Sequence, residues 1–242
     1  MSDDVRILHL VLFSHSLQYD EMYKLTSPYY KSKNIKTYYY TYLNTLQNDF
    51  EVVDDILYIK GNETFVPGIL NKTIKAFEYI EQDVKDYDYV VRSNISTIIN
   101  FNLLKEKLKK HPLDYGGGFV HNLHWIDRNC GITNEKHWNK KYATGTSIIL
   151  STKLLKEILI HKNCIEYNLI DDVAIGVLIH DFFKEVLLID FGGHYIYAND
   201  YEGRTKHLLS EIETNNYIFY RNRSSKREVD VYQMKVILDY LK

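Results

Sequence analysis

Polar side chains directly follow one apolar run of the sequence. Arg92, Ser93, Asn94 and Ser96 come after the apolar residues Tyr87–Val91. A guanidinium offers a fixed fork of donors, and short hydroxyl and amide side chains hold polar atoms near the backbone, which suits a phosphate or a sugar. If the apolar run is a strand, these groups lie at its carboxyl end, where open α/β sheets bind ligands. The alternative is a strand end whose polar residues cap the next helix.

Two adjacent acids, Asp171 and Asp172, stand before the apolar stretch Val173–Ile179. Neighbouring side chains cannot face the same way, so one acid can serve the helix start while the other projects into a cleft as a general base. Helix capping alone also explains the pair, because acids are favoured in the first turn of a helix.

The densest basic cluster lies near the end of the chain, at Arg221, Arg223, Lys226 and Arg227. It follows a strand-like segment, so it is a candidate for neutralising a diphosphate. A solvated basic surface is the alternative interpretation.

His194 follows an apolar strand-like run and two glycines, a position from which it can bind a metal or a phosphate. A satisfied structural histidine is the alternative, since no other residues show the spacing of metal ligands. The run Gly116–Gly118 matches neither the phosphate-loop nor the dinucleotide-binding pattern. It indicates close approach of the backbone to a ligand or to a neighbouring strand.

The length and composition are those of a globular chain that can form one large α/β domain or two small ones, and one domain is expected. The chain has 242 residues, 45% apolar and 26% charged, enough for a sizeable core. A formal net charge of −2 argues against general nucleic-acid binding, which needs a basic face. Cys130 and Cys164 are too few for a disulfide framework, so a reducing compartment is expected.

The N-terminal apolar run reads as a first strand and not as a signal peptide, because two acids precede it and no basic leader is present. No apolar run approaches 18 residues, so no membrane span is expected and the predicted location is cytoplasmic.

Alternating strand and helix patterns favour a single sheet flanked by helices. Strands are expected at Val5–Ser14, Thr37–Leu43, Glu51–Lys60, Tyr87–Val91, the end of Tyr142–Ser151, Glu185–Phe191 and the start of Tyr217–Arg227. Helices are expected at Tyr19–Tyr29, Gly68–Gln82, Phe101–Lys110, Lys153–His161, Val173–Ile179 and Asp230–Leu241.

Four segments, taken in order, carry a resemblance to a known family. They are the helix NKTIKA (71–76), the strand YVVR (89–92) running into SNIS (93–96), the strand YATGTSIILS (142–151) and the helix start DDVAIG (171–176). Over roughly residues 56–194 this pattern resembles the inverting GT-A glycosyltransferases, in particular the β-1,3-galactosyltransferase and fringe-like group. The Arg-Ser-Asn-x-Ser sequence and the Arg-rich tail are similar to glycosyltransferase-like proteins of large DNA viruses and bacteria.

The resemblance implies a single GT-A-like (Rossmann-like) α/β domain over residues 1–242, with a mixed, mainly parallel central sheet. Residues 1–100 would form the nucleotide-binding half, and residues 101–242 the acceptor and catalytic half. The implied activity is a hexosyltransferase-type reaction, with inversion, from a nucleotide-diphosphate sugar, expected to be a UDP-sugar, to a hydroxyl of a glycan or other acceptor. Asp172 would be the general base, and Asp171 would orient the site or cap the helix. The expected donor-binding residues are Ser14, Lys72, Arg92, Ser93, Asn94, Ser96, Gly145, His194, Arg221 and Arg223.

One departure from the family concerns the metal. The family carries an Asp-x-Asp motif that binds Mn²⁺ or Mg²⁺, whereas Asn94 and Ser96 hold those places here. Both are neutral and weaker ligands for hard cations, so no residue is assigned to a metal, and the use of Mn²⁺ or Mg²⁺ stays an open alternative. Arg92 and the basic cluster are the candidates for meeting the charge of the leaving diphosphate.

Two further functions stay open. A catalytically silent protein that binds nucleotide sugars or glycans would explain the altered Asp-x-Asp positions, although the retained Asp171-Asp172 pair argues against it. A nucleotidyltransferase would use a similar sheet but needs acidic metal ligands, which the sequence does not offer.

Overall fold

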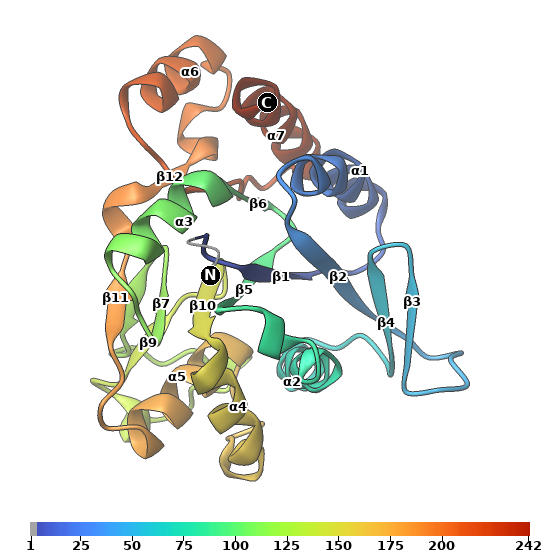
Figure 1. Ribbon diagram of the computed structural model, residues 1–242, viewed down its shortest axis with the longest axis vertical. Helices are drawn as coiled ribbons and strands as arrows, with labels where there is room; N and C mark the ends of the chain where they lie inside the picture. The colour runs from blue at the N-terminus through green and yellow to red at the C-terminus, as the bar shows by residue number, and fades with distance from the viewer. Residues whose placement is uncertain (1–3) are drawn as a thin grey trace.

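An eight-stranded mixed sheet runs through the molecule (Figure 1). The computed structural model describes residues 4–242. In spatial order the strands are β11 (Leu188–Asp190), β7 (Tyr115–Gly117), β10 (Ser147–Ser151), β5 (Tyr89–Asn94), β1 (Ile7–Leu12), β2 (Lys36–Leu43), β4 (Ile56–Lys60) and β3 (Phe50–Val53). The central run β5-β1-β2-β4 is parallel. β10 is antiparallel to both of its neighbours, β3 is antiparallel to β4, and β11 is parallel to β7.

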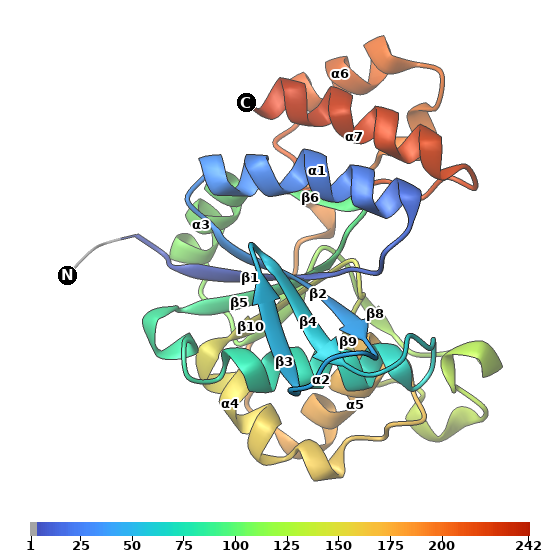
Figure 2. The ribbon, with the colours of Figure 1, turned by 90° about the vertical axis from the view of Figure 1, so that its right-hand side faces the viewer.

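Helices cover both faces of this sheet (Figure 2). On one face lie α2 (Gly68–Ile80), α4 (Thr152–Ile160) and α5 (Asp171–Phe182). On the other lie α1 (Leu17–Ser32), α3 (Phe101–Lys110), α6 (Thr205–Thr214) and α7 (Arg227–Leu241). Each face therefore has its own apolar core, and strands between two cores need apolar residues on both sides. β1 shows this directly, because Leu8 and Leu10 enter one core while Ile7 and Val11 enter the other.

Two smaller sheets extend the main one. Strands β12 (Tyr195–Tyr197), β13 (Phe219–Arg221) and β6 (Thr97–Ile99) form a three-stranded sheet, and β8 (Val120–Asn122) pairs with β9 (Lys141–Ala143). Short 3-10 helices occur at Val84–Asp86, Arg128–Cys130, Glu135–His137, Lys162–Cys164, Gly192–His194 and Ala198–Tyr201. β6 follows β5 after only two residues, so the chain leaves the main sheet and enters the small one at once.

Polar residues at strand ends begin two of the helices. Asn100 precedes α3 and accepts a hydrogen bond from the Leu103 amide, and Ser151 precedes α4 and accepts one from the Leu154 amide. Both are N-caps of the expected chemical type. By contrast, α5 has Ile170 as its N-cap, with Asp171 and Asp172 inside the first turn. Of the two roles expected for Asp171, capping the helix is therefore wrong, and orienting the site stays a prediction.

The expected α/β architecture and mainly parallel sheet are confirmed, with local corrections. The segment Glu51–Lys60 is not one strand, because the chain turns at Asp54, whose φ is 57°, and forms the β3–β4 hairpin. Helix α6 and strands β6 and β12 were not expected. The run Gly116–Gly118 does mark close strand approach. A Cβ on Gly116 would lie 2.3 Å from the carbonyl oxygen of Ile189 in β11, and one on Gly117 would lie 2.1 Å from that of Ser147 in β10.

Candidate active site

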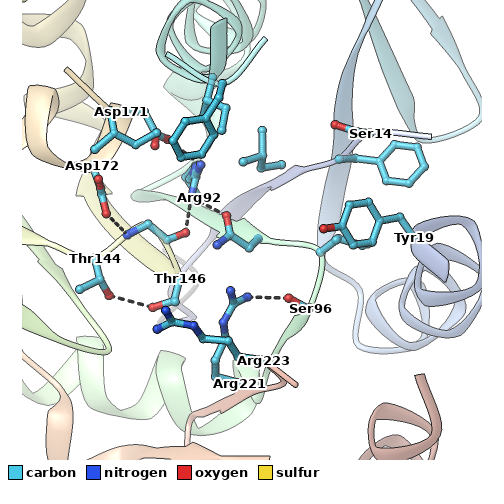
Figure 3. Close-up of a pocket in the computed structure, with 18 of the residues that line it drawn as sticks. Ser14, Tyr19, Arg92, Ser96, Thr144, Thr146, Asp171, Asp172, Arg221 and Arg223 are labelled. Atoms are coloured by element: carbon cyan, nitrogen blue, oxygen red, sulfur yellow. Dashed lines mark hydrogen bonds and ion pairs between the residues drawn. The ribbon is translucent and has the colours of Figure 1, made fainter. Parts of the chain in front are cut away.

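A pocket of about 590 Å³ opens at the carboxyl ends of β1 and β5 (Figure 3). The chain order places β2 on one side of β1 and β5 on the other, which makes this the topological switch point where doubly wound sheets bind ligands. The loop at residues 144–146, the first turn of α5 and the segment from β13 to α7 complete the wall.

Arg92 forms the buried floor of this pocket. Its Nη2 lies 2.5 Å from Asp171 Oδ2, and the two side chains are 1% and 4% exposed. The remaining nitrogens donate to the Tyr40 hydroxyl (3.1 Å), to Asn94 Oδ1 (2.9 Å) and to the carbonyl of Gly145. Most of the donors of Arg92 are therefore used inside the protein, so it positions Asp171 and the 144–146 loop.

Register explains why these groups meet. β10 pairs antiparallel with β5, with Ser147 opposite Ser93, so the preceding loop lies beside the end of β5. Gly145 has no side chain there, and a Cβ would lie 3.1 Å from Arg92 Nη1 and 3.3 Å from Asp172 Oδ2. A larger residue would press on both the arginine and the carboxylate.

Asp172 is the partly exposed carboxylate of the pocket. Its Oδ2 accepts from the Gly145 amide (2.7 Å) and its Oδ1 from the Val173 amide (2.8 Å). Burial, and then the neighbouring charge of Asp171, raise the pKa of Asp172 to about 6, against the lowering effect of these amides and of Arg92. A carboxylate with a pKa near neutrality is suited to accept a proton as a general base.

A basic wall faces the two acids across the pocket (Figure 3). β13 pairs antiparallel with β6, with Arg221 opposite Thr97. Arg221 Nη1 therefore reaches Ser96 Oγ at 2.6 Å and Thr97 Oγ1 at 3.3 Å. Arg223 and Arg227 line the same wall.

Three of the expected binding residues do not line the pocket. Lys72 lies behind it, where Nζ pairs with Glu63 at 2.6 Å and donates to the Phe13 carbonyl at 2.9 Å. Ser93 is fully buried and bonded to His9 Nε2 at 2.8 Å. His194 Nδ1 lies 3.1 Å from the Asn216 carbonyl, which fits the alternative of a structural histidine. Lining the pocket are Ser14, Arg92, Asn94, Ser96, Gly145, Asp171, Asp172, Arg221 and Arg223.

Several lining residues were missed by the sequence patterns. Aromatic side chains of His121, Trp125, Tyr142 and Tyr197 line the pocket, and the ring centroids of Trp125 and Tyr142 are 5.9 Å apart. They come from separate segments with no common spacing. In this Tyr-rich chain, with 22 tyrosines, residue type alone gives little signal.

The side-chain oxygens of Asn94 and Ser96, where the resemblance would place metal-binding carboxylates, do not fit a divalent metal. Asn94 Oδ1 accepts from the Arg92 guanidinium, and Ser96 Oγ accepts from the Arg221 guanidinium. A metal ion bound to these oxygens would lie close to both guanidinium groups, which already donate to the same atoms, and would be repelled by their positive charge. Within residues 4–242, no group of three His, Cys, Asp or Glu side chains is placed to hold a metal ion.

The fold is thus a mixed α/β sheet with helices on both faces and a pocket at its topological switch point. A solved structure with this fold is that of a glycosyltransferase involved in the glycosylation of the major capsid of PBCV-1. It matches 95% of this chain and 98% of its own, with a TM-score of 0.51 and 10% sequence identity. At this identity the likeness concerns the fold.

Sequence comparison adds little. No family model matches the chain. A stretch of 106 residues, 44% of this chain, is 30% identical to potassium channel K2 of Plasmodium berghei, but it spans only 7% of that protein. None of the helices formed by residues 4–242 has the length and apolar character needed to cross a membrane.

Proposed function

We propose that this chain is a glycosyltransferase that moves a sugar from a UDP-sugar to a hydroxyl of a glycan or other acceptor, with inversion at the anomeric carbon. The single observation that carries the proposal is the two-sided pocket at the switch point. It holds a partly exposed carboxylate, Asp172, on one side and three arginines on the other. A nucleotide-diphosphate sugar needs both a cationic site for its phosphates and a base near its reacting carbon.

The two sides of the pocket have different roles in this reaction. Asp172 takes the proton of the acceptor hydroxyl as its oxygen forms a bond to the anomeric carbon. The bond from that carbon to the diphosphate oxygen breaks, and its electron pair leaves with UDP. The arginines meet the charge that develops on the leaving diphosphate. Asp172 returns its proton to solvent after the product departs.

The other residues position these groups. Arg92 and Asp171 hold each other and the 144–146 loop, and Gly145 donates its amide to Asp172. Ser14 and Asn94, at the ends of β1 and β5, lie where the nucleotide half of the donor would bind. The half formed by residues 101–242 supplies Asp172 and the aromatic side chains of Trp125 and Tyr142, which we assign to the acceptor side.

The test begins with a thermal-shift screen of nucleotide sugars, because a ligand that binds only the folded state raises the unfolding temperature. UDP release is then measured with each donor that binds, over a panel of sugar and glycan acceptors. Asp172→Asn is expected to keep donor binding while lowering turnover at least about 100-fold, the usual worth of a positioned base. Asp49→Asn removes an exposed carboxylate that does not line the pocket and should leave turnover unchanged. Full turnover by Asp172→Asn would refute the role of the base.

A second candidate is a silent protein that binds nucleotide sugars without transferring them. The specific observation in its favour is that Asn94 and Ser96 hold the positions of the metal carboxylates and are bonded to arginines. Donor binding without turnover on any acceptor of the panel would support this candidate over the enzyme.

A further inference from the structure

Arg221 is a buried cation that forms no ion pair with any carboxylate in the part of the chain that the structure describes. It is 8% exposed, and its hydrogen bonds go to the neutral hydroxyls of Ser96 and Thr97. Its Nε is buried without any hydrogen-bond partner, and among residues 4–242 no carboxylate forms an ion pair with it. Burying a charge is costly unless it is paired. The arrangement is therefore incomplete until an anion enters the pocket.

Two more arginines add positive charge beside Arg221 and so favour the binding of an anion. Arg223 is exposed and Arg227 half-buried, and both line the pocket next to Arg221. Figure 3 shows Arg221 and Arg223 side by side, with Ser96 at the end of the Arg221 guanidinium. Arg227 is the one with a partner, since its Nη1 lies 2.6 Å from Asp230. Burial, and then repulsion from Arg227 and Arg223, lower the pKa of Arg221 despite the raising effects of Tyr195 and Asp230, the direction expected for a buried cation with like charges nearby.

The location of Arg221, Arg223 and Arg227 indicates a more specific role than binding any anion. Ser96 stands at a position where the resembled family keeps a metal-binding carboxylate, and here its hydroxyl accepts from Arg221. Positive charge is thus supplied at that position by a guanidinium fixed through the pairing of β13 with β6. Arg presents two parallel donors to phosphate oxygens and so can bind a diphosphate without a bridging ion.

We propose that Arg221, with Arg223 and Arg227, forms a diphosphate site that works without a divalent metal, Arg221 replacing the ion. This inference rests on the proposed function for the identity of the donor, but it concerns the binding step alone. The UDP moiety binds with its phosphates on Arg221 and Arg223, and the same residues take up the charge of the leaving group. Divalent metal adds nothing to its affinity.

Calorimetry with UDP, inorganic pyrophosphate and uridine tests the proposal directly. The wild-type protein is titrated in excess EDTA and again with Mn²⁺. UDP is expected to bind with the same affinity within about threefold in both buffers, and much more tightly than uridine. Binding of UDP only when Mn²⁺ is present would overturn the proposal, and so would failure of both UDP and inorganic pyrophosphate to bind in either buffer.

Variants locate the phosphates. Arg223→Ala removes an exposed side chain and should fold normally, and it is expected to weaken UDP about 10-fold or more, since one charge-assisted hydrogen bond is worth that much. Uridine affinity should stay unchanged. Arg221→Lys should have a larger effect in the same direction. Lys226→Ala is the matched control, because Lys226 is an exposed cation of the same segment that does not line the pocket. Equal loss of UDP and uridine affinity in Arg223→Ala would overturn the assignment.

Ser96→Asp separates the two ways of holding a diphosphate. The Ser96 Oγ lies 2.6 Å from Arg221 Nη1, so a carboxylate at this position would neutralise the arginine, and UDP affinity in EDTA should fall at least about 10-fold. If the site used a metal, the same change would restore a ligand and Mn²⁺ would raise affinity above that of the wild type. That rise would refute the proposal.

These results are distinguishable from those that test the transferase itself. UDP binding in EDTA that depends on Arg223, without turnover on any acceptor, would refute the enzyme but support the metal-free site. Turnover that requires Mn²⁺ would support the enzyme but refute the metal-free site.

Discussion

Asp171 and Asp172 are adjacent residues whose surroundings give them opposite tasks. Asp171 is 3% exposed and paired with Arg92, while Asp172 is partly exposed and bonded only to backbone amides. The sequence predicted that one acid would serve the structure and the other the pocket. What it could not provide was the partner of Asp171, because Arg92 is 79 residues away and meets it only through the sheet.

The raised pKa of Asp172 predicts an acid limb in the rate of transfer. A general base must be ionised, and the pKa of Asp172 is raised to about 6 by burial and by Asp171. The rate at limiting substrate should therefore fall below about pH 6, by about tenfold for each further pH unit. The measurement is UDP release between pH 5 and 8. A rate that is constant down to pH 5 would contradict the assignment.

The raised pKa of Asp172 also predicts that its ionised form lowers the stability of the folded protein. The folded pKa of Asp172, about 6, lies above the ordinary value of 3.8, so the folded state binds an extra proton between these values. Wild-type stability relative to Asp172→Asn should therefore rise as the pH falls from 6 towards 4, by about 1 kcal/mol per pH unit. Urea unfolding at pH 8, 6 and 5 measures this. A difference that does not change with pH would show that the carboxyl titrates normally.

At the scale of elements, apolar periodicity predicted the strands and helices that contain long runs of buried apolar residues. The expected helix Phe101–Lys110 coincides with α3, and Gly68–Gln82 contains α2. Strand β13 falls in the segment Tyr217–Arg227, whose start was expected to be a strand. Strands β6 and β12 are only three residues long and exist through pairing with β13. No local pattern could define β6 and β12, although the pairing of β6 with β13 is what brings Arg221 to Ser96.

Helix α5 predicts a sharp sensitivity at its glycine. A Cβ on Gly176 would lie 2.3 Å from the Cβ and 2.8 Å from the Cα of Tyr142 in β9. Gly176→Ala should therefore separate α5 from β9 and cost about 1–3 kcal/mol, the usual penalty of overpacking. Thermal unfolding should show a fall of roughly 2–10 °C for a chain of this size.

The matched control is Gly193→Ala, because nothing lies within 4 Å of the Cβ it would add. Its unfolding temperature should stay within about 1–2 °C of wild type, as for most exposed substitutions. If Gly176→Ala were equally neutral, α5 and β9 would not be in the close contact described. Because α5 carries Asp172, a folded Gly176→Ala protein should also transfer sugar more slowly.

At the scale of the whole molecule, the two cores meet at the central strands, and the pocket lies where those strands end. β1 and β5 are neighbours, and their carboxyl ends supply Ser14, Asn94 and Ser96. The apolar runs predicted this edge as the ligand site. The opposite walls come from β13 and α5, which are remote in sequence and could be placed only through the complete sheet topology.

A histidine in the middle of the sheet predicts how the whole fold responds to acid. His9 in β1 is fully buried between Tyr30 and Phe101, and burial lowers its pKa from 6.5 to about 3. The folded state therefore excludes a proton that the unfolded chain binds below pH 6.5. The stability contributed by neutral His9 is fully present above pH 6.5 and is lost as the pH falls towards 3. Asp172 acts in the opposite direction between about pH 6 and 4, so the two effects partly cancel in the wild type.

Comparison of variants separates these effects. Unfolding free energies are measured at pH 7.5, 6 and 5 for Asp172→Asn and for the double variant Asp172→Asn with His9→Gln. The advantage of the protein that retains His9 should shrink by about 1 kcal/mol per pH unit below 6.5. If the difference in unfolding free energy between the variants with and without His9 were constant from pH 7.5 to 5, His9 would bind a proton as readily in the folded state as in the unfolded chain. Burial between the two aromatic rings would then not govern the acid stability of this fold.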